Sequence, residues 1–349
     1  MTLPPIKTAV IGYGFSAKTF HIPFVSSLAE FELVAISTSN GEAVSKEWPS
    51  AEHYVSASEL LTQSDAELVI ITAPNDVHFN LAKQALENGK HVIIEKPFVT
   101  RVEDGETLIT LAKENNRVLS VYHNRRWDGD FLTAKKLIDE KHIGEIKHFE
   151  SHFDRFRPEV RQRWREQATD GGGILFDLGS HLIDQALELF GVPDAISAVC
   201  EMMREGSTTV DYFDVVMHYP NHVAIVHGDL FSAGPNKRFT LKGTKGSYEK
   251  LGLDPQESRL IEGVLPNEPS WADETSDNYG CLYGAEHDEV VTTVRGGYQH
   301  YFLQMAEAIR HNTVPPVRAE DALWNIKLIE LAMESSRLGQ KLPVIKDDK

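Results

Sequence analysis

The stretch that decides the fold of this chain is AVIGYGFSA, residues 9–17. Its apolar beginning predicts a buried strand, and its glycines predict a tight turn into a helix. Gly12 would allow the turn, Gly14 would let the backbone approach a pyrophosphate, and Ala17 would let the helix pack closely on the strand. This is the G-x-G-x-x-A pattern of dinucleotide-binding folds, in which phosphates lie at the N-terminus of the helix. A glycine-rich turn that binds nothing could have the same sequence, so other parts of the chain must separate the two interpretations.

Length and composition indicate a two-domain soluble protein. The 349 residues exceed one ordinary domain, and 41% apolar with 25% charged residues is typical of globular proteins. The formal charge of −17 argues against a nucleic-acid partner, because phosphate binding needs a basic surface. Cys200 and Cys281 give neither a disulfide framework nor a metal cluster and fit a reducing compartment. No apolar run is long enough to span a membrane and no signal-peptide pattern is present, so we expect a cytoplasmic protein without a membrane partner.

Strand and helix alternate over roughly residues 5–122, at lengths typical of βαβ units. The run Glu67–Thr72 is almost entirely apolar, as expected of a central strand covered on both faces. Pro23 should disturb the first helix, and Thr100–Glu103 fits a capping box. After the first strand we predict strands at Glu32–Ser37, Glu67–Thr72, His91–Ile94 and Arg117–Val121, and helices at Lys18–Leu28, Asp76–Asn88 and Thr100–Asn115. The fold class predicted for residues 1–122 is α/β, a doubly wound parallel sheet of the Rossmann type.

The residues that follow the second predicted strand favour NADP over NAD. An Asp or Glu at this place would hydrogen-bond the ribose 2′-hydroxyl of NAD and repel the 2′-phosphate of NADP. This chain instead has Ser37, Thr38, Ser39 and Asn40, with no carboxylate before Glu42. Hydroxyls and an amide can hydrogen-bond a phosphate, although no arginine lies in the stretch to clamp it. We therefore expect NADP as the cofactor, with NAD as the alternative; the same residues could also cap the next helix.

Glu95-Lys96-Pro97 directly follows another predicted strand of this sheet. Ligands of open α/β sheets bind at the carboxyl ends of the strands. A lysine fixed there by the following proline could donate a hydrogen bond to a substrate oxygen or hold its proton. Taken alone, Lys96 could equally be an exposed lysine at a strand end, paired with Glu95.

A carboxylate and an imidazole lie four residues apart at the start of an apolar-periodic segment that ends at Phe190. On a helix, Asp177 and His181 share one face. A carboxylate that hydrogen-bonds an imidazole fixes its tautomer and raises its basicity, which suits a general base near neutral pH. The glycines of 171–173 would let the backbone turn sharply or approach a ligand closely. The alternative is that Asp177 caps the helix and His181 is a partly buried, satisfied side chain.

These features occur together in a known family. The glycine fingerprint, Glu95-Lys96-Pro97 and the Asp-x-Gly-x-His motif at 177–181 have the order and spacing found in the Gfo/Idh/MocA family, which the chain resembles over nearly its whole length. Members of that family are NAD(P)-dependent oxidoreductases of sugars, inositols and related polyols. The tracts Gly12–Ser16, Val121–Asp128 and Tyr212-Phe213 resemble most closely the subgroup that includes NADP-dependent scyllo-inositol dehydrogenases. The three motifs indicate the family and fold much more strongly than the substrate.

The resemblance implies a role for each matching residue. Lys96 corresponds to the lysine that contacts the substrate hydroxyl and the nicotinamide, and His181 to the proton acceptor, with Asp177 beside it. Thr72–Asn75, with His78 one turn later, corresponds to the cofactor-contact loop. The cofactor-binding residues expected are Gly12, Gly14, Phe15, Ser16, Ala17, Ser37, Thr38, Ser39, Pro74, Asn75, His78, Glu95, Lys96 and Asn124. The substrate-binding residues expected are Lys96, Asn124, Arg126, Asp154, Asp177 and His181. No metal is expected.

From about residue 123 the pattern changes to that of an α+β domain, residues 123–349. A predicted helix at Phe131–Glu140 is followed by extended chain at Ile146–Arg157, in which His148, Glu150 and His152 alternate. Strand-like runs then follow without intervening helices at Ala195–Met203, Tyr212–Tyr219, His222–Leu230, Arg238–Lys242 and Ser247–Leu251. This predicts a large, mostly antiparallel sheet with helices on one face. Residues 252–297 are predicted to have little regular structure, and two helices close the chain, at Tyr298–His311 and Ala319–Arg337.

The uncovered face of such a sheet would be a sizeable apolar patch. Members of the family bury it against another subunit, so a homo-oligomer, a dimer or tetramer, is expected through the C-terminal sheet. His218 and His222 are four residues apart, but a predicted hairpin turn lies between them, so no metal site is expected there. The charged stretch Asp154–Arg165, which contains Trp164, is either a solvated face or part of the substrate cleft, and Asp154 is predicted to contact a substrate hydroxyl.

Together these expectations define a reaction, the reversible oxidation of a secondary ring alcohol of a small polyol or sugar. Lys96 would hydrogen-bond the alcohol oxygen, His181 would take its proton, and Asp177 would orient the imidazole. We expect the lysine and the imidazole to meet at one carbon–oxygen bond beside the nicotinamide. Two alternatives stay open, an aldose or other sugar dehydrogenase and a regulator that binds NADP or a sugar without turnover. The presence of all three catalytic-type residues counts against the regulator.

Overall fold

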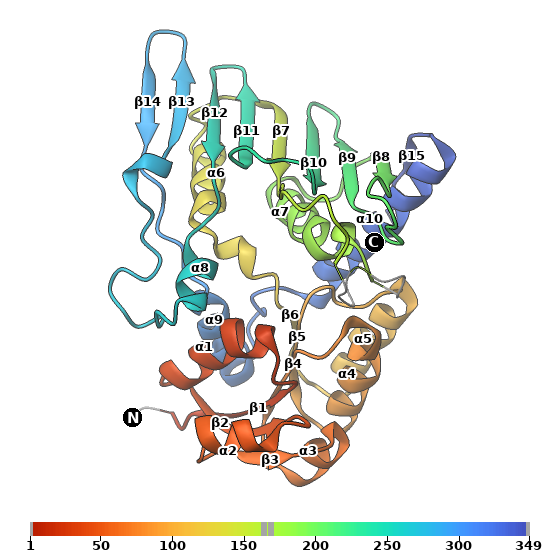
Figure 1. The fold of residues 1–349 in the computed structure, drawn as a ribbon, viewed down its shortest axis with the longest axis vertical. Helices are drawn as coiled ribbons and strands as arrows, with labels where there is room; N and C mark the ends of the chain where they lie inside the picture. Colours follow the sequence, from red (N-terminus) through yellow and green to blue (C-terminus); the bar gives the residue numbers. More distant parts are fainter. Residues whose placement is uncertain (1–2, 162–165, 167–170, 347–349) are drawn as a thin grey trace. The chain divides into compact units, whose positions relative to one another are not determined.

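The computed structural model describes residues 3–161, 166 and 171–346, which form two compact units (Figure 1). The first contains Met1–Asn124, Gln256–Ala272 and Gly297–Leu323, and the second contains Arg125–Pro255, Asp273–Gly296 and Trp324–Lys349. The first boundary therefore lies at 124/125 rather than 122/123, and two later segments return to the first unit. They return because they bury aromatic side chains there: the Trp271 ring packs edge-on against Phe24, and Phe302 stacks on the same ring.

The first unit contains a six-stranded parallel sheet with helices on both sides (Figure 1). Its strands are β1 (Ile6–Ile11), β2 (Phe31–Ser37), β3 (Glu52–Tyr54), β4 (Leu68–Ile71), β5 (His91–Ile94) and β6 (Leu119–Val121). Its helices are α1 (Ile22–Ser27), α2 (Gly41–Glu47), α3 (Ala57–Gln63), α4 (His78–Glu87), α5 (Val102–Glu114), α8 (Gln256–Ile261) and α9 (Gln299–His311). The strand order β3-β2-β1-β4-β5-β6 reverses direction between β1 and β4, the switch point of a doubly wound fold. The predicted fold class of this half is confirmed.

The central strand β4 is buried on both faces, as its apolar sequence predicts. Leu68, Val69, Ile70 and Ile71 each have 0% exposed surface. Fully burying one such side chain stabilises the fold by about 1.5–3 kcal/mol. Because parallel strands end at the same edge of a sheet, the loops after β1, β2, β4 and β5 meet at one edge, where open sheets bind their ligands.

The helix after the glycine turn is continuous over 15–27 but widens before α1 into the π turn η1 (Ala17–His21). The Ile22 N–H donates to the Ala17 carbonyl, five residues back. Pro23 lies in the first turn of α1, where its missing N–H is tolerated. The disturbance predicted from Pro23 therefore takes the form of a local change in helix type.

The second unit contains a nine-stranded sheet in the order β14-β13-β12-β11-β7-β10-β9-β8-β15. Its strands are β7 (Ile146–His152), β8 (Ala195–Glu201), β9 (Tyr212–His218), β10 (Val223–Asp229), β11 (Lys237–Gly243), β12 (Gly246–Leu251), β13 (Gly280–Gly284), β14 (Asp288–Val291) and β15 (Leu342–Pro343). Its helices are α6 (Gly129–Asp139), α7 (Ser180–Phe190) and α10 (Ala319–Leu338), the last of which begins in the first unit. β7 and β10 pair in parallel and the other neighbours pair antiparallel. The predicted mostly antiparallel sheet is confirmed.

Side chains of β7, β9 and β10 alternate between two faces of this sheet. One set is fully buried in a core with α6, α7 and α10, and includes Phe149, Val215 and Val226. The intervening residues on the opposite face are half-buried, and several are polar, such as His152 and His227. We call this second side the open face.

Two local predictions are wrong. The N-cap of α5 is Arg101, whose side chain bonds to Asp104 instead of capping the helix, so Thr100–Glu103 is not a capping box. The region 252–297 is not irregular, because it contains α8 and the β13–β14 hairpin. The hairpin is stabilised by ladder pairing with β12, a long-range contact that the local abundance of turn-forming residues does not reveal.

Within the ranges that the structure describes, no helix combines the length and hydropathy needed to cross a membrane.

Candidate functional site

The glycine turn after β1 has the geometry that the fingerprint predicts. Gly12 has a φ of +97°, and its N–H donates to the Ser37 carbonyl at 2.9 Å. A Cβ at Gly12 would lie 2.7 Å from Thr72 Oγ1, which is inside van der Waals contact. Gly14 is exposed, and a Cβ there would meet no described residue within 4 Å, so its backbone is open to a ligand. Ala17 is fully buried where the helix packs on the sheet.

Glu95, at the end of β5, joins the glycine turn to the lysine turn. Its Oε1 accepts hydrogen bonds from His21 Nε2 at 2.8 Å and from Ser16 Oγ, and its Oε2 accepts one from the Lys96 N–H at 3.0 Å. Burial alone would raise the pKa of Glu95, but the hydrogen bond and charge of His21, with the Ser16 bond, lower it to about 2. Glu95 is therefore an anion that fixes the backbone of Lys96 against the helix after the glycine turn.

His21 is a site-forming residue that sequence reasoning missed. Its ring is fully buried and packs against the Tyr122 ring, with 4.3 Å between the centroids and 47° between the ring planes. A single histidine within an apolar helix is usually an ordinary core residue, so the local pattern carries no signal. Its partner Glu95 is 74 residues away, and only the folded sheet brings the two together.

His78 holds the loop after β4 to the turn after β5. Its Nε2 lies 2.9 Å from the Ala73 carbonyl and its Nδ1 3.0 Å from the Pro97 carbonyl. The side chain has no exposed surface, and burial lowers the pKa of His78. Pro74 and Asn75 lie nearer the surface of the same loop. A direct cofactor contact of these three residues stays a prediction.

The polar turn after β2 caps the next helix. Asn40 Oδ1 accepts a hydrogen bond from the Ala43 N–H at 3.3 Å, and Thr38 Oγ1 accepts one from the Asn40 N–H at 3.2 Å. The capping alternative is therefore confirmed for this turn. Ser37 is buried against the glycine turn, whereas Ser39 is exposed. Their contact with a cofactor phosphate stays a prediction.

In the second unit, Asp177 lies in the π turn η5 (Leu175–Gly179) and His181 in the first turn of α7. The helix begins before Asp177, whose N–H donates to the Gly173 carbonyl at 3.1 Å, so Asp177 is not an N-cap. The π turn changes the angular offset between the two side chains from that of an α-helix. His181 is 6% exposed, and the backbone beside it is fixed by Asn325, whose Nδ2 donates to the Ser180 carbonyl at 2.6 Å.

The glycines before this helix serve a sharp turn. Gly171 and Gly173 both have positive φ, of 77° and 86°. A Cβ at Gly173 would lie 2.8 Å from the Val210 carbonyl oxygen, and the Ile174 N–H donates to the same oxygen at 2.9 Å. The close approach expected at these glycines is therefore to the neighbouring backbone.

Arg155 belongs to the charged stretch that the sequence offers as a possible part of the substrate cleft, but its contact with Asp177 was not predicted. Its Nη1 lies 3.7 Å from Asp177 Oδ2. Asp154, the residue predicted to contact a substrate hydroxyl, instead has its Oδ2 3.1 Å from His152 Nδ1 on the open face. Successive residues of extended chain point to opposite faces, so the structure brings Arg155, not Asp154, to Asp177. Residues 162–165 of this charged stretch, which include Trp164 and Arg165, lie outside the described residues.

Arg126 is held by α7. Its Nε and Nη2 donate to the two oxygens of Asp184 at 2.8 and 2.7 Å, and its Nη1 donates to Glu188 at 3.0 Å. A bidentate arginine–carboxylate pair is a strong and directional contact. Asn124, at the start of the 3₁₀ turn η3 (Asn124–Trp127), is buried. Substrate contacts of Arg126 and Asn124 stay predictions.

A parallel sheet in this strand order, with an open glycine turn at its switch point, defines a dinucleotide-binding Rossmann protein. Comparison with protein families agrees. Residues 6–123 match the oxidoreductase family, NAD-binding Rossmann fold, and residues 135–344 match the oxidoreductase family, C-terminal alpha/beta domain. The chain belongs to the Gfo/Idh/MocA oxidoreductase family, and its first unit is an NAD(P)-binding domain.

Individual relatives match along almost the whole chain. The uncharacterised oxidoreductase YdgJ of Escherichia coli is 42% identical over 334 residues, covering 95% of this chain and 96% of YdgJ. IolW of Bacillus subtilis, described as scyllo-inositol 2-dehydrogenase (NADP(+)), is 40% identical over 336 residues, covering 95% of this chain and 94% of IolW. A solved structure of YvaA from B. subtilis superposes with a TM-score of 0.95 at 38% identity, covering 99% of this chain and 100% of YvaA.

Proposed function

We propose that this protein is an NADP(H)-preferring dehydrogenase that interconverts a secondary alcohol of a cyclic polyol, with scyllo-inositol favoured, and the corresponding ketone. The observation that carries the proposal is the 40% identity to the scyllo-inositol 2-dehydrogenase (NADP(+)) IolW over 95% of this chain. Lys96, Asp177 and His181, the acid–base groups expected in such an enzyme, are all present in this sequence.

The first unit has the features needed to hold the cofactor. Gly14 leaves open space over its backbone, and the positive φ of Gly12 makes the turn that brings a pyrophosphate close. The hydroxyls of Ser37, the last residue of β2, and of Ser39 can donate hydrogen bonds to a 2′-phosphate without the repulsion that an acidic residue would cause. The bound nicotinamide supplies the hydride chemistry, and the chain supplies position and proton transfer.

Three side chains are assigned to the substrate hydroxyl and the transfer of its proton. His181 takes the proton of the substrate hydroxyl, and the Lys96 ammonium donates a hydrogen bond to the same oxygen, which stabilises its developing negative charge. Asp177 stabilises the imidazolium that His181 becomes. Glu95, an anion bonded to the Lys96 N–H, fixes the backbone of the lysine turn.

Arg155 acts in this scheme as a positioning residue. Its guanidinium lies 3.7 Å from Asp177 Oδ2, so its positive charge faces the carboxylate beside the proton acceptor. Replacing Arg155 with Gln removes that charge and should alter the pH dependence of turnover more than the affinity for cofactor. Arg155→Lys keeps the charge, so it should alter the pH dependence less than Arg155→Gln does.

The test is a substrate and cofactor panel with the purified full chain. Reduction of NADP⁺ and of NAD⁺ is followed by absorbance with scyllo-inositol, other inositols, glucose, galactose and xylose. We expect the highest kcat/KM for NADP⁺ with an inositol. A preference for NAD⁺ would overturn the interpretation of Ser37–Asn40, and a preference for an aldose would overturn the substrate class.

One result would overturn the enzyme assignment itself. Tight NADPH binding without turnover of any polyol or sugar would favour a regulator that binds these molecules. Substituting Lys96 with Met in parallel shows whether any weak activity belongs to this site, because loss of the ammonium should abolish it.

A further inference from the structure

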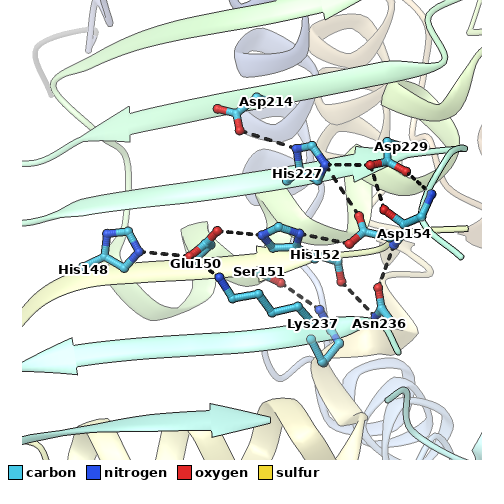
Figure 2. A network of polar contacts seen from close by, with 12 residues as sticks. His148, Glu150, Ser151, His152, Asp154, Asp214, His227, Asp229, Asn236 and Lys237 are labelled. Carbon is cyan, nitrogen blue, oxygen red and sulfur yellow. Dashed lines mark hydrogen bonds and ion pairs between the residues drawn. The ribbon is translucent and has the colours of Figure 1, made fainter. Parts of the chain in front are cut away.

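A cluster of two histidines and one aspartate lies on the open face of the nine-stranded sheet (Figure 2). His152 on β7 and His227 on β10 are direct partners in the parallel pairing of these strands, and Asp154 follows β7 on the same face. One nitrogen of each ring and one oxygen of Asp154 all lie within 4.8 Å of one another. The cluster shares no residue with the groups assigned to hydride and proton transfer, so a ligand bound there would not depend on the proposed function.

The spacing of these atoms is that of a metal's ligands. His152 Nδ1 lies 3.1 Å from Asp154 Oδ2, and His227 Nε2 lies 3.8 Å from Asp154 Oδ1. Zinc bonds of about 2.0–2.2 Å place two tetrahedral ligand atoms about 3.3–3.6 Å apart. The two distances reach different oxygens of the same carboxylate and lie just below and just above that range, so small side-chain movements would let one oxygen and the two nitrogens surround an ion.

Asp154 has an unused oxygen that faces the cluster. Its side chain is 9% exposed, and its Oδ1 is buried and accepts no hydrogen bond from any residue in the described ranges. Leaving a buried carboxylate oxygen without a hydrogen bond costs free energy, which a bound cation would recover.

Each imidazole also has a carboxylate behind it. His152 Nε2 lies 2.8 Å from Glu150 Oε1, and His227 Nδ1 lies 3.5 Å from Asp214 Oδ2 (Figure 2). Metal-binding histidines nearly always donate their second N–H to such a group, which fixes the tautomer and raises the basicity of the ligand nitrogen. The arrangement therefore leaves Nδ1 of His152 and Nε2 of His227 facing Asp154.

The surroundings favour a cation. Four carboxylates, those of Glu150, Asp154, Asp214 and Asp229, contact the two rings. Lys237, 3.0 Å from Glu150, places one ammonium group at the edge of this network (Figure 2).

We propose that His152, Asp154 and His227 bind one divalent transition-metal ion of the zinc class, with a fourth position left for water or Asp229. Each imidazole binds the ion through an unprotonated nitrogen, so a proton on either ligand nitrogen is released to solvent on binding. Two imidazoles with one carboxylate suit Zn²⁺ or Co²⁺, whereas Mg²⁺ and Ca²⁺ prefer oxygen ligands only.

The experiment uses the full chain without a histidine tag, stripped of metal by dialysis against a chelator. ZnCl₂ is titrated by calorimetry and CoCl₂ by visible absorption. We expect one ion per chain, micromolar affinity or better for Zn²⁺, and the intense visible bands of tetrahedral Co²⁺. MgCl₂ should give no comparable binding.

Three variants locate the ion. His227→Ala removes a ligand, whereas Asp214→Asn removes only the carboxylate behind that ligand. Loss of such an outer partner typically lowers metal affinity by about 10–100-fold, and loss of the ligand itself should lower it at least as much. His218→Ala is the matched control, because His218 is also on the open face of β9 but bonds to Ser197. It should bind Zn²⁺ as the unsubstituted protein does.

Two outcomes would overturn the proposal. One is an unsubstituted chain that binds no Zn²⁺. The other is unchanged Zn²⁺ affinity in both His227→Ala and Asp214→Asn, which would place the ion elsewhere. Melting temperatures of the metal-free variants show whether they fold, and Asp154→Asn, which keeps the side-chain shape, replaces any variant that does not.

Discussion

β4 in the first unit and β10 in the second are both central strands, but they are buried differently. Every residue of β4 is apolar and fully buried, whereas β10 alternates between core residues and half-buried residues of the open face, which include Ile225 and His227. A strand such as β4 carries no polar side chain along its length, and the polar group Glu95 lies where β5 has ended. The second sheet carries polar groups along its strands, as His152 and His227 do. Whether one face of a strand is buried or both therefore decides where polar side chains can lie in each sheet.

The largest effect expected is on catalysis and separates the tasks of the two units. His181→Ala should reduce kcat by about 10²–10⁴, the usual contribution of a positioned acid–base group. NADPH affinity, a property of the first unit, should stay unchanged. Steady-state kinetics and fluorescence titration measure the two quantities. His222→Ala, whose ring stacks on Tyr219, is the control. Turnover of His181→Ala within a few-fold of the unsubstituted protein would remove His181 from its role.

The next effect compares the same substitution in the two sheets. Ile70→Ala in β4 leaves a cavity and should lower the free energy of unfolding by about 2–5 kcal/mol at any protein concentration. Ile225→Ala removes a half-buried side chain on the open face of β10 and should lower the free energy of unfolding by less. If a second copy covers that face, the size of this loss should depend on protein concentration. Melting temperatures at two widely different concentrations test both statements. Equal, concentration-independent losses would contradict the difference between the sheets.

A smaller effect concerns the two glycines of the turn after β1. Gly12→Ala should destabilise the first unit by about 1–3 kcal/mol, because φ is +97° and the new Cβ would lie 2.7 Å from Thr72 Oγ1. Gly14→Ala has room, so it should leave the melting temperature unchanged and weaken NADPH binding. Calorimetry and fluorescence titration separate stability from affinity. Normal affinity in Gly14→Ala would mean that no pyrophosphate approaches that backbone.

The smallest effect is a pH dependence of the first unit. The Val118 N–H donates to His91 Nδ1 at 2.9 Å, which requires an unprotonated nitrogen. Burial, and secondarily the charge of Arg117, lower the pKa of His91 from 6.5 to about 4. The unfolded chain then binds the proton more readily, so this contribution to stability is complete above pH 6.5 and is lost as the pH falls toward 4.

His91→Gln keeps an acceptor that does not titrate in this range. Its melting temperature should fall less between about pH 7 and pH 5 than that of the unsubstituted protein. The same fall in melting temperature in both proteins would show that His91 does not contribute to the pH dependence of stability.

Features that depend on a local sequence pattern can be predicted from the sequence, whereas contacts between residues distant in the chain cannot. The apolar run of β4, the glycine turn and the alternating strands of the second sheet carry their own signals, and the structure confirms them. The His21–Glu95 pair, the Arg155–Asp177 contact and the His152–His227 pairing each join residues distant in the chain, so no local pattern marks them. The β13–β14 hairpin was missed for the same reason.

The most direct test of the central claim follows the transferred hydrogen. scyllo-Inositol deuterated at its ring carbons is incubated with NADP⁺ and the full chain, and the cofactor is analysed by mass spectrometry. The proposed dehydrogenase should place deuterium in the reduced cofactor, and His181→Ala should slow its appearance. Unlabelled NADPH, or no reduction at all while the cofactor is bound, would contradict hydride transfer from a polyol carbon.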